Sequence, residues 1–482
     1  MPHFGGCGMV FSSPVFVFLF LTSTLLLYYI IPGIKAKNVL LTVMSIIFYA
    51  WGEPVFVLLM LLCIAANYIC AVFINKSRGK PSSKVFLTFG CEVSLCILVA
   101  FKYSGFLVST FNGITGLSLG VPQIKMPIGI SFYTFQAMSF TIDVYRGDVK
   151  KMPGFLGFMM YVSLFPQLVA GPIVRFTDIE DQIDKRTISV TGFAKGLRRF
   201  VTGLAKKLLI ADYAYGLVKT FIGGDLSSAP VFSVIMGMLF YSFYIYFDFS
   251  GYSDMAIGMG RMFGFKYPEN FMHPYTALSV TDFWRRWHIT LSTFFRDYVY
   301  IPLGGNRRGR ARQVLNLFIV WALTGLWHGA SWNFVLWGLY YFLILVLEKL
   351  VLGRLLQKLP RILRHIWSLL VVYIGWTIFY FESFPKLGQA LSIMFGFSGH
   401  AFADRVHLTM LYNNIPFIII AIIGCLPVGP FVKGMFGKLK RRDLRFGVAE
   451  ASLTVVYNAV LMFLCIAALI GATNSPFLYF RF

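Results

Sequence analysis

The chain has 482 residues, of which 57% are hydrophobic and only 13% are charged. A soluble globular protein carries about 25% charged residues, so this composition excludes a soluble domain with one anchor and predicts a polytopic membrane protein. Lys and Arg number 43 against 20 Asp and Glu, which gives a formal net charge of +23. The basic residues lie between apolar runs, where they indicate positive-inside topology and headgroup contacts rather than binding to nucleic acid.

Residues 1–8 resemble a short N-terminal extension. The apolar run that follows, residues 11–31, has no basic n-region and no small-residue cleavage site, so we expect an uncleaved transmembrane helix. The basic loop at residues 76–84 is the clearest cytoplasmic marker in this half. Residues 106–121 are weakly amphipathic and are predicted to lie in the membrane interface. Further apolar segments are residues 39–51, 55–74, 85–103, 127–143 and 155–172.

The middle of the chain mixes apolar and basic residues. Residues 192–222 carry basic side chains at helical spacing beside apolar ones, which predicts an amphipathic helix that begins at the cytoplasmic surface and runs into the membrane. Residues 231–257 are apolar, and residues 282–302 are amphipathic and arginine-rich. The basic residues of the amphipathic helix are Lys195, Arg198, Arg199, Lys206 and Lys207.

The C-terminal part is plainer. The basic stretch at residues 433–445 is predicted to be cytoplasmic, which puts the tail, residues 473–482, on the extracytoplasmic side. At about 20 residues for each full span, we expect roughly ten to twelve transmembrane or partly inserted helices. We see no internal repeat and no soluble domain, so the predicted fold is all-α with one membrane domain over residues 1–482. The last apolar segments are residues 367–381, 387–397, 415–428 and 453–470.

One histidine, His328, lies deep inside the longest apolar run, residues 315–350. An ionisable side chain at membrane depth is costly to place, so His328 is the first candidate for a functional site. Small residues beside it allow another backbone or a substrate to come close, and the indole of Trp327 is among those that surround it. A neutral imidazole is the usual general base for activating a hydroxyl. The alternative is a buried histidine that hydrogen-bonds a neighbouring helix.

The second candidate is His288, which closes the stretch DFWRRWH at residues 282–288. Two tryptophans together with Arg285 and Arg286 are typical of an interfacial helix whose arginines reach phosphates or headgroups. The alternative is that Arg285 and Arg286 extend to the membrane interface and indicate topology without a functional role.

Two further groups have a functional and a structural interpretation. Asp248 lies among aromatic residues, where its carboxylate either orients a histidine, pairs with an arginine or caps a helix that begins near Gly251. Arg307 and Arg308 follow two glycines, and a Gly-rich loop with arginines can hold a phosphate such as that of coenzyme A. Two glycines do not make a phosphate motif, so a plain cytoplasmic loop is the favoured alternative.

Other kinds of site lack their signatures. The seven cysteines form no CxxC pair, which favours inert buried thiols over a disulfide frame or a zinc site. No Walker A loop, dinucleotide-binding fingerprint or nucleophile elbow occurs, so we expect no metal and no bound cofactor. The chain ends in the aromatic segment FLYFRF, and such a tail should dock in the membrane interface or in a pocket of the protein.

Five segments together resemble the membrane-bound O-acyltransferase (MBOAT) family, close to its bacterial AlgI/DltB-like branch. The resemblance covers nearly the whole chain. The segments are MPIGISFYTFQAMSFTIDVYRG from Met126, YVSLFPQLVAGPIVR from Tyr161, YFDFSGYSDMAIGMGRMFGF from Tyr246, FWRRWHITLSTFFRDYVYIPLGGNRRG from Phe283 and LTGLWHGASWNFVLWG from Leu323.

The resemblance implies a ring of tilted helices around a funnel through a bacterial cytoplasmic membrane. His328 matches the family's catalytic histidine, and His288 matches the second motif position. An acyl group, most plausibly acetyl, would enter from a cytoplasmic acyl-CoA or acyl-carrier thioester and leave on the outer side. Orienting candidates are Asp248, Trp327, Arg285 and Arg286, and donor-binding candidates are Arg307 and Arg308.

The tail is similar to the end of a small membrane peptide that works with DltB-type transferases, where a tyrosine hydroxyl is proposed to carry the acyl group. By this likeness Tyr479 accepts the acyl group and hands it to an extracytoplasmic SGNH-type (AlgJ- or DltD-like) acyltransferase. That partner would O-acylate a cell-surface polysaccharide, as in alginate biosynthesis. The alternatives are a D-alanyl transferase and, from a different class, a lipid or substrate transporter, which the missing repeats disfavour.

Overall fold

The computed structural model describes residues 9–440, 445–471 and 477, and among these it contains helices and turns without a β-strand. Contacts divide the chain into two compact units. We call residues 1–200, 252–269 and 472–482 the first unit, and residues 201–251 and 270–471 the second unit. The all-α prediction is confirmed, and the expectation of one membrane domain stays a prediction.

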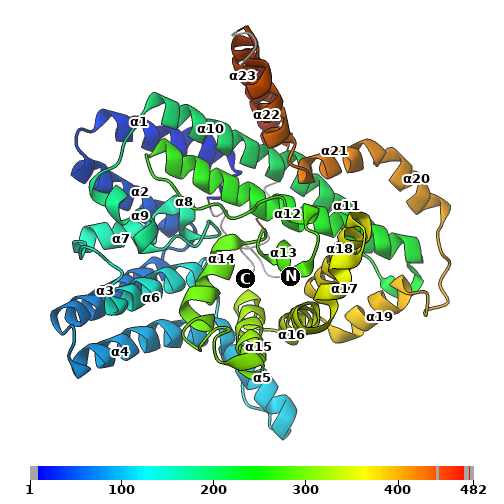
Figure 1. The fold of residues 1–482 in the computed structure, drawn as a ribbon, viewed down its shortest axis with the longest axis horizontal. Coiled ribbons are helices and arrows are strands. Elements are labelled where there is room, and N and C mark those ends of the chain that lie inside the picture. The colour runs from blue at the N-terminus through cyan, green and yellow to red at the C-terminus, as the bar shows by residue number, and fades with distance from the viewer. Residues whose placement is uncertain (1–8, 441–444, 472–476, 478–482) are drawn as a thin grey trace. The chain divides into compact units, whose positions relative to one another are not determined.

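The helices are drawn in Figure 1. Those of the first unit are η1 (Val15–Leu21), α1 (Thr22–Ile30), α2 (Ile34–Gly52), α3 (Phe56–Lys76), α4 (Pro81–Leu98), η2 (Val99–Tyr103), α5 (Ser104–Thr115), α6 (Ile130–Arg146), α7 (Phe155–Ser163), α8 (Phe165–Leu168) and α9 (Phe176–Asp184). Two helices contribute residues to both units, α10 (Val190–Ala205) and α12 (Val231–Met262). Those of the second unit are η3 (Lys206–Ala211), α11 (Asp212–Ile222), η4 (Leu226–Ser228), η5 (Pro274–Thr276), α13 (Val280–Trp284), α14 (Ile289–Phe295), η6 (Arg296–Tyr300), α15 (Gly309–His328), α16 (Trp332–Leu347), η7 (Glu348–Leu352), α17 (Gly353–Lys358), α18 (Arg361–Tyr380), α19 (Phe384–Met394), α20 (Arg405–Asn413), α21 (Ile415–Cys425), α22 (Val428–Lys440) and α23 (Arg445–Gly471).

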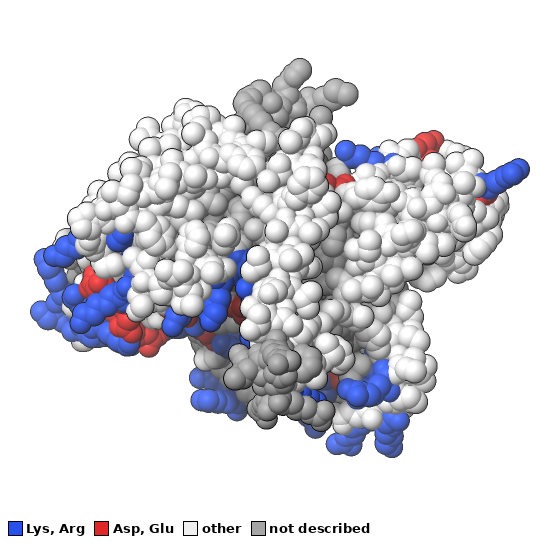
Figure 2. All heavy atoms as spheres, turned by 90° about the horizontal axis from the view of Figure 1, so that it is seen from above, with Lys and Arg blue, Asp and Glu red and all other residues white. Residues whose placement is uncertain are grey.

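Seven helices in the described part of the chain are long and apolar enough to cross a membrane, or eight if the bent pair α20 and α21 forms one span. Other predicted segments are shorter or less apolar helices. The interfacial position expected for residues 106–121 stays a prediction: α5 continues the apolar helical stretch Pro81–Thr115, and Gly116 then adopts a left-handed conformation. Figure 2 shows broad uncharged areas between separate patches of Lys and Arg, which suits a protein embedded in lipid.

In the first unit, α3, α4 and α6 pack side by side (Figure 1). A buried asparagine links the three helices: Asn67 Nδ2 donates to Ser94 Oγ at 2.8 Å, and Thr141 Oγ1 donates to Asn67 Oδ1 at 2.9 Å. Side-chain hydrogen bonds of this kind hold helices together in lipid, where apolar contact alone gives little preference for protein over lipid. One buried amide therefore sets how three helices pack.

Glycines bring α10 and α12 into backbone contact. A Cβ added at Gly258 would lie 2.7 Å from the carbonyl oxygen of Gly196, and one added at Gly251 would lie 2.8 Å from that of Gly203. Larger residues at these positions would push the helices apart. Such close approach through small residues is a common mode of helix packing in membranes.

The close approach places Lys207 of η3 against α12 inside the second unit. Its Nζ lies 2.8 Å from Asp248 Oδ1 and 2.9 Å from Asp212 Oδ1, and the side chains of Lys207 and Asp248 are 0% and 1% exposed. The predicted amphipathic helix was expected to run from the cytoplasmic surface into the membrane, and Lys207 lies buried in it against Asp248. The sequence periodicity of this helix does not reveal these carboxylate partners.

The apolar run around His328 is a hairpin rather than one helix. α15 ends at His328, Gly329 is extended, and α16 begins at Trp332. The hairpin closes tightly, because a Cβ on Gly325 would lie 2.4 Å from the Phe334 carbonyl oxygen and one on Gly338 would lie 2.4 Å from that of Trp321. The expectation that small residues here let another backbone come close is confirmed.

Candidate active site

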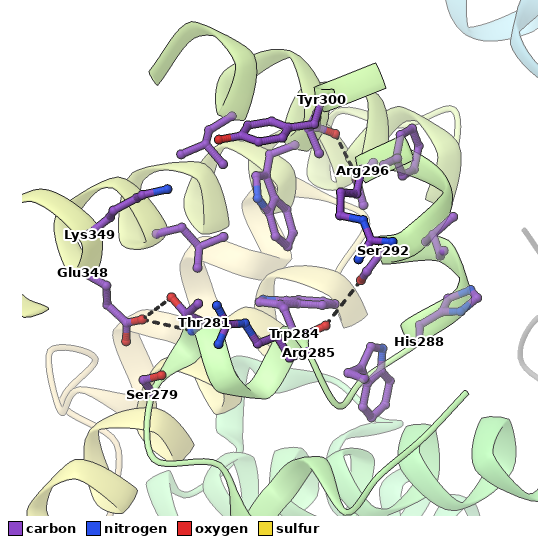
Figure 3. A pocket seen from close by; sticks show the side chains of 18 of the residues that line it. Ser279, Thr281, Trp284, Arg285, His288, Ser292, Arg296, Tyr300, Glu348 and Lys349 are labelled. Carbon is purple, nitrogen blue, oxygen red and sulfur yellow. Dashed lines mark hydrogen bonds between the residues drawn. The ribbon is translucent and has the colours of Figure 1, made fainter. Parts of the chain in front are cut away.

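The second unit contains a cavity of about 610 Å³ that both candidate histidines line (Figure 3). Its walls come from α13, α14, η6, α15, α16, η7, α17 and α18. Small-molecule sites typically occupy about 300–1,000 Å³, so the cavity is large enough for a substrate. The sequence singled out His288 and His328 separately, and the fold brings them to the same space.

His328 is the last residue of α15 and is 3% exposed. Aromatic rings surround it: the ring centroids of Trp327, Trp337 and Phe379 lie 4.9, 4.8 and 5.2 Å from that of His328. The two helices of the hairpin, α15 and α16, supply the first two rings, and α18 supplies the third. Packing of this kind limits the rotation of the imidazole and keeps bulk water away from it.

His288 lies between α13 and α14 and is 1% exposed. Its Nδ1 lies 3.1 Å from Asn270 Oδ1. An amide oxygen only accepts hydrogen bonds, so Nδ1 carries the proton and Nε2 carries the basic lone pair. Burial lowers the pKa of His288 to about 3, which keeps the imidazole neutral at physiological pH.

Trp327 connects the two histidines. Its ring centroid lies 5.7 Å from that of His288 and 4.9 Å from that of His328. Trp284 adds a wall of the cavity, with its ring centroid 4.9 Å from that of Trp321. The prediction that tryptophans surround the histidine is confirmed for Trp327 and Trp337.

The cavity also carries positive charge. Arg285, Lys349 and Arg364 line it, and none of the three forms an ion pair with a carboxylate in the part of the chain that the structure describes. A fourth cation, Arg296, lines the cavity and pairs with Asp297 at 2.7 Å. The excess of cationic side chains suits an anionic ligand.

The lining carboxylate, Glu348, does not neutralise these cations. Its two oxygens accept hydrogen bonds from the backbone N–H groups of Val280 and Thr281 at 2.8 and 3.0 Å, from Thr281 Oγ1 at 2.9 Å and from Trp367 Nε1 at 3.1 Å. Figure 3 shows Glu348 turned toward Thr281. Glu348 therefore anchors the start of α13, the helix that leads to His288.

The other predicted site residues lie elsewhere. Arg286 donates to Asp282 Oδ1 at 2.9 Å, four residues earlier on the same segment, and does not line the cavity. Arg307 and Arg308 are exposed and are also outside the cavity lining, so their role in donor binding stays a prediction. Asp248 lies in the middle of α12 and pairs with Lys207. The interpretation of Asp248 as a helix cap is wrong, because α12 continues through Gly251.

Tyr479 lies outside the described residues, so its role as an acyl carrier stays a prediction. Phe477, two residues earlier, is described and is 1% exposed, with its ring centroid 5.0 Å from that of Tyr252 in the first unit. The expectation that the tail docks into the protein is met by this residue.

Sequence reasoning missed Asn270, Glu348 and Arg364. Glu348 is an acidic residue near the end of the long apolar run, which was a usable signal of a buried role. Asn270 and Arg364 lie in short polar stretches that resemble ordinary loops and helix ends, and only the fold brings Asn270 to His288 and Arg364 to the cavity. Among the described residues, no group of three His, Cys, Asp or Glu side chains is arranged to hold a metal ion.

Comparison with known proteins shows the family of the chain. Residues 43–384 match the model of the membrane-bound O-acyltransferase family. The chain is 38% identical to the probable alginate O-acetylase AlgI of Azotobacter vinelandii, over 98% of this chain and 100% of the relative. It is 40% identical to the protein of that name from Pseudomonas aeruginosa, over 86% and 81% of the two chains. It is also 33% identical to the peptidoglycan O-acetyltransferase of Helicobacter pylori, over 84% and 85%.

Proposed function

Because this chain belongs to the membrane-bound O-acyltransferase family, we propose that it moves an acetyl group from a cytoplasmic thioester across a bacterial inner membrane. The chain is a multi-pass membrane O-acyltransferase that acts in polysaccharide acylation. The observation that supports the finer proposal is the cavity lined by both histidines and by the cations Arg285, Lys349 and Arg364. The final acceptor is a hydroxyl of a cell-surface polysaccharide, as the names of the alginate and peptidoglycan relatives suggest.

The donor is acetyl-CoA. Its phosphates carry several negative charges, which Arg285, Lys349 and Arg364 complement at the cavity wall. The thioester end then reaches into the part of the cavity lined by the histidines. An uncharged transported lipid would gain nothing from such a wall, so the charge favours an anionic thioester over the transporter alternative.

In the chemical step, His328 removes the proton from the acceptor hydroxyl while the oxygen attacks the thioester carbonyl carbon. A tetrahedral intermediate forms and then collapses, the carbon–sulfur bond breaks, and His328 returns the proton to the departing thiolate sulfur. The products are an acetyl ester and a free thiol. Because the acceptor hydroxyl has one proton, His288 accepts its hydrogen bond through the Nε2 lone pair as the acceptor enters, and the hydroxyl then turns that proton to His328 for the attack. Holding both reactants in a dry cavity lowers the barrier further.

The first acceptor in this proposal is the hydroxyl of Tyr479. Its ester passes the acetyl group to an extracytoplasmic SGNH-type acyltransferase, which acetylates the polysaccharide. Tyr479→Phe should leave donor binding intact and remove the acetyl–protein adduct that labelled acetyl-CoA forms. Wild-type transfer by that variant would rule out the relay without affecting the role of His328.

His328→Ala tests the catalytic assignment. Loss of a general base should lower the rate of acetyl transfer from labelled acetyl-CoA by at least about 100-fold. The matched control is His407→Ala on α20, whose imidazole pairs with Asp404 and does not line the cavity, and this variant should transfer normally. Membrane insertion is checked by the yield and monodispersity of both purified variants. Transfer by His328→Ala within threefold of the control would overturn the assignment.

A further inference from the structure

Hydrogen bonds around His288 converge on one residue, Asn270, which is 0% exposed. Asn270 Oδ1 accepts from His288 Nδ1 at 3.1 Å, from Thr290 Oγ1 at 2.9 Å and from the Thr290 backbone N–H at 3.3 Å. The backbone N–H can only donate, so it establishes which end of the amide faces His288. The oxygen faces the imidazole, and the ring proton therefore sits on Nδ1.

The backbone of His288 is held by the same segment. His288 has φ 44° and ψ 54°, a left-handed conformation that costs a residue with a side chain about 1–2 kcal/mol. The Asn270 carbonyl oxygen accepts from the Ile289 N–H at 3.0 Å, and the Arg286 carbonyl oxygen accepts from the Met272 N–H at 3.0 Å. These two bonds clamp the chain on both sides of His288 and support the unfavourable conformation.

The chemistry of Asn270 also decides the charge of His288. A carboxylate in the same place would stabilise the imidazolium, whereas an amide oxygen accepts the Nδ1 proton without supplying a full negative charge. Glu348 is the carboxylate that lines the cavity, and it is bound to the start of α13. The local arrangement thus keeps His288 neutral with its lone pair on Nε2.

We propose that Asn270 is a positioning residue for acyl transfer: it fixes the tautomer, the neutral charge and the left-handed backbone of His288. The inference rests on the proposed function, because it concerns how His288 reaches its working form. Asn270 does not contact the substrate. Its effect is therefore expected in the protonation behaviour of His288 and not in the binding of the donor.

The direct test is the ring-nitrogen NMR spectrum of protein labelled with ¹⁵N-histidine. The His288 signal is identified by its absence from the spectrum of His288→Asn. A protonated Nδ1 and a lone pair on Nε2 at pH 7 are expected for the wild type. A His288 protonated on Nε2 would overturn the proposal, and this measurement requires no Asn270 variant to fold.

The functional test compares Asn270→Asp with Asn270→Ala. The near-isosteric Asp keeps the acceptor and adds a charge, so the acid limb of the pH–rate profile should move upward by at least about one pH unit. Asn270→Ala should lower kcat by roughly 10- to 100-fold with KM for acetyl-CoA within threefold of the wild type. An unchanged profile in Asn270→Asp together with normal kcat in Asn270→Ala would overturn the proposal.

Asn316→Ala is the matched control for truncating a buried asparagine. Asn316 is 0% exposed, and its amide donates to the Gly305 carbonyl oxygen at 2.9 Å, outside the cavity lining. This variant should lose stability without changing the pH–rate profile. Failure of the proposed function would show separately, as normal transfer by His328→Ala, whereas failure of this inference alone would leave His328→Ala inactive and the Asn270 variants normal.

Discussion

Two regions of the second unit bury ionisable side chains, and they differ in whether a carboxylate of the protein pairs with the buried group. In the first region, the ammonium group of Lys207 lies within 2.9 Å of two carboxylates, those of Asp248 and Asp212. Burial lowers the pKa of Lys207, but these two carboxylates more than offset that effect and leave the pKa above its usual value. In the cavity, Arg285, Lys349 and Arg364 have no carboxylate partner among the described residues, and His288 faces an amide. The first region neutralises its charge within the protein, and the second is complementary to a ligand.

The largest expected effect comes from breaking the ion pairs of Lys207 with Asp248 and Asp212. Lys207→Met leaves Asp248 buried without its counter-charge, and removing one partner of a buried ion pair costs about 3–5 kcal/mol of stability. The free energy of unfolding in detergent measures this loss. Lys195→Met on the exposed side of α10 should change it little. Equal stability of the two variants would mean that Lys207 is not essential to the packing of α12.

A smaller loss of stability is expected when the pH is lowered and His288 becomes protonated. The pKa of His288 is lowered by burial to about 3, whereas an unfolded histidine titrates near about 6.5. The stability that depends on the neutral form is therefore fully present above about pH 6.5 and is lost as the pH falls toward the folded pKa. Between pH 7 and pH 5 the loss should be about 2 kcal/mol.

Unfolding of wild type and His288→Asn at both pH values isolates this contribution, because the variant lacks the titrating group. The wild type should lose more stability than the variant on acidification. Parallel losses in the two proteins would show that another group controls the acid response, and the contrast with the permanently charged Lys207 would then fail.

The smallest effect is expected from removing one cationic side chain of the cavity. Arg364→Ala removes a cavity cation without breaking an ion pair, so the KM for acetyl-CoA should rise by roughly tenfold with kcat and stability nearly unchanged. Added salt should reduce the difference between wild type and variant. Arg307→Ala is the control, since Arg307 is exposed outside the cavity. A larger rise in KM for Arg307→Ala would move the donor site to the Gly-rich loop.

Much of the molecule could be predicted before its fold was known. Composition predicted a polytopic helical protein, and the five motifs predicted a family that comparison confirms. The cost of an ionisable group among apolar residues pointed to His328, which is buried among aromatic rings. The class and the family could be predicted because both depend on local sequence, namely hydrophobicity, spacing and motif identity, whereas the catalytic role of His328 stays a prediction.

Other features could not be predicted because the decisive partner is distant in sequence. The basic pattern of residues 192–222 did not reveal that Lys207 pairs with Asp248, which lies 41 residues away. The apolar pattern of residues 315–350 did not reveal that Gly329 divides the run into a hairpin. Periodicity describes which face of a helix is apolar and does not identify what that face meets.

The sequence by itself determined the class of the protein and its family, and it singled out the two histidines as candidate site residues. These results depend on residue type and motif spacing. Only the tertiary structure decided that the histidines share a cavity, that Glu348 serves α13 and that Asn270 holds the Nδ1 proton of His288. The physical reason is that a cavity and a hydrogen bond depend on distances between elements, and those distances are set by packing of the whole second unit.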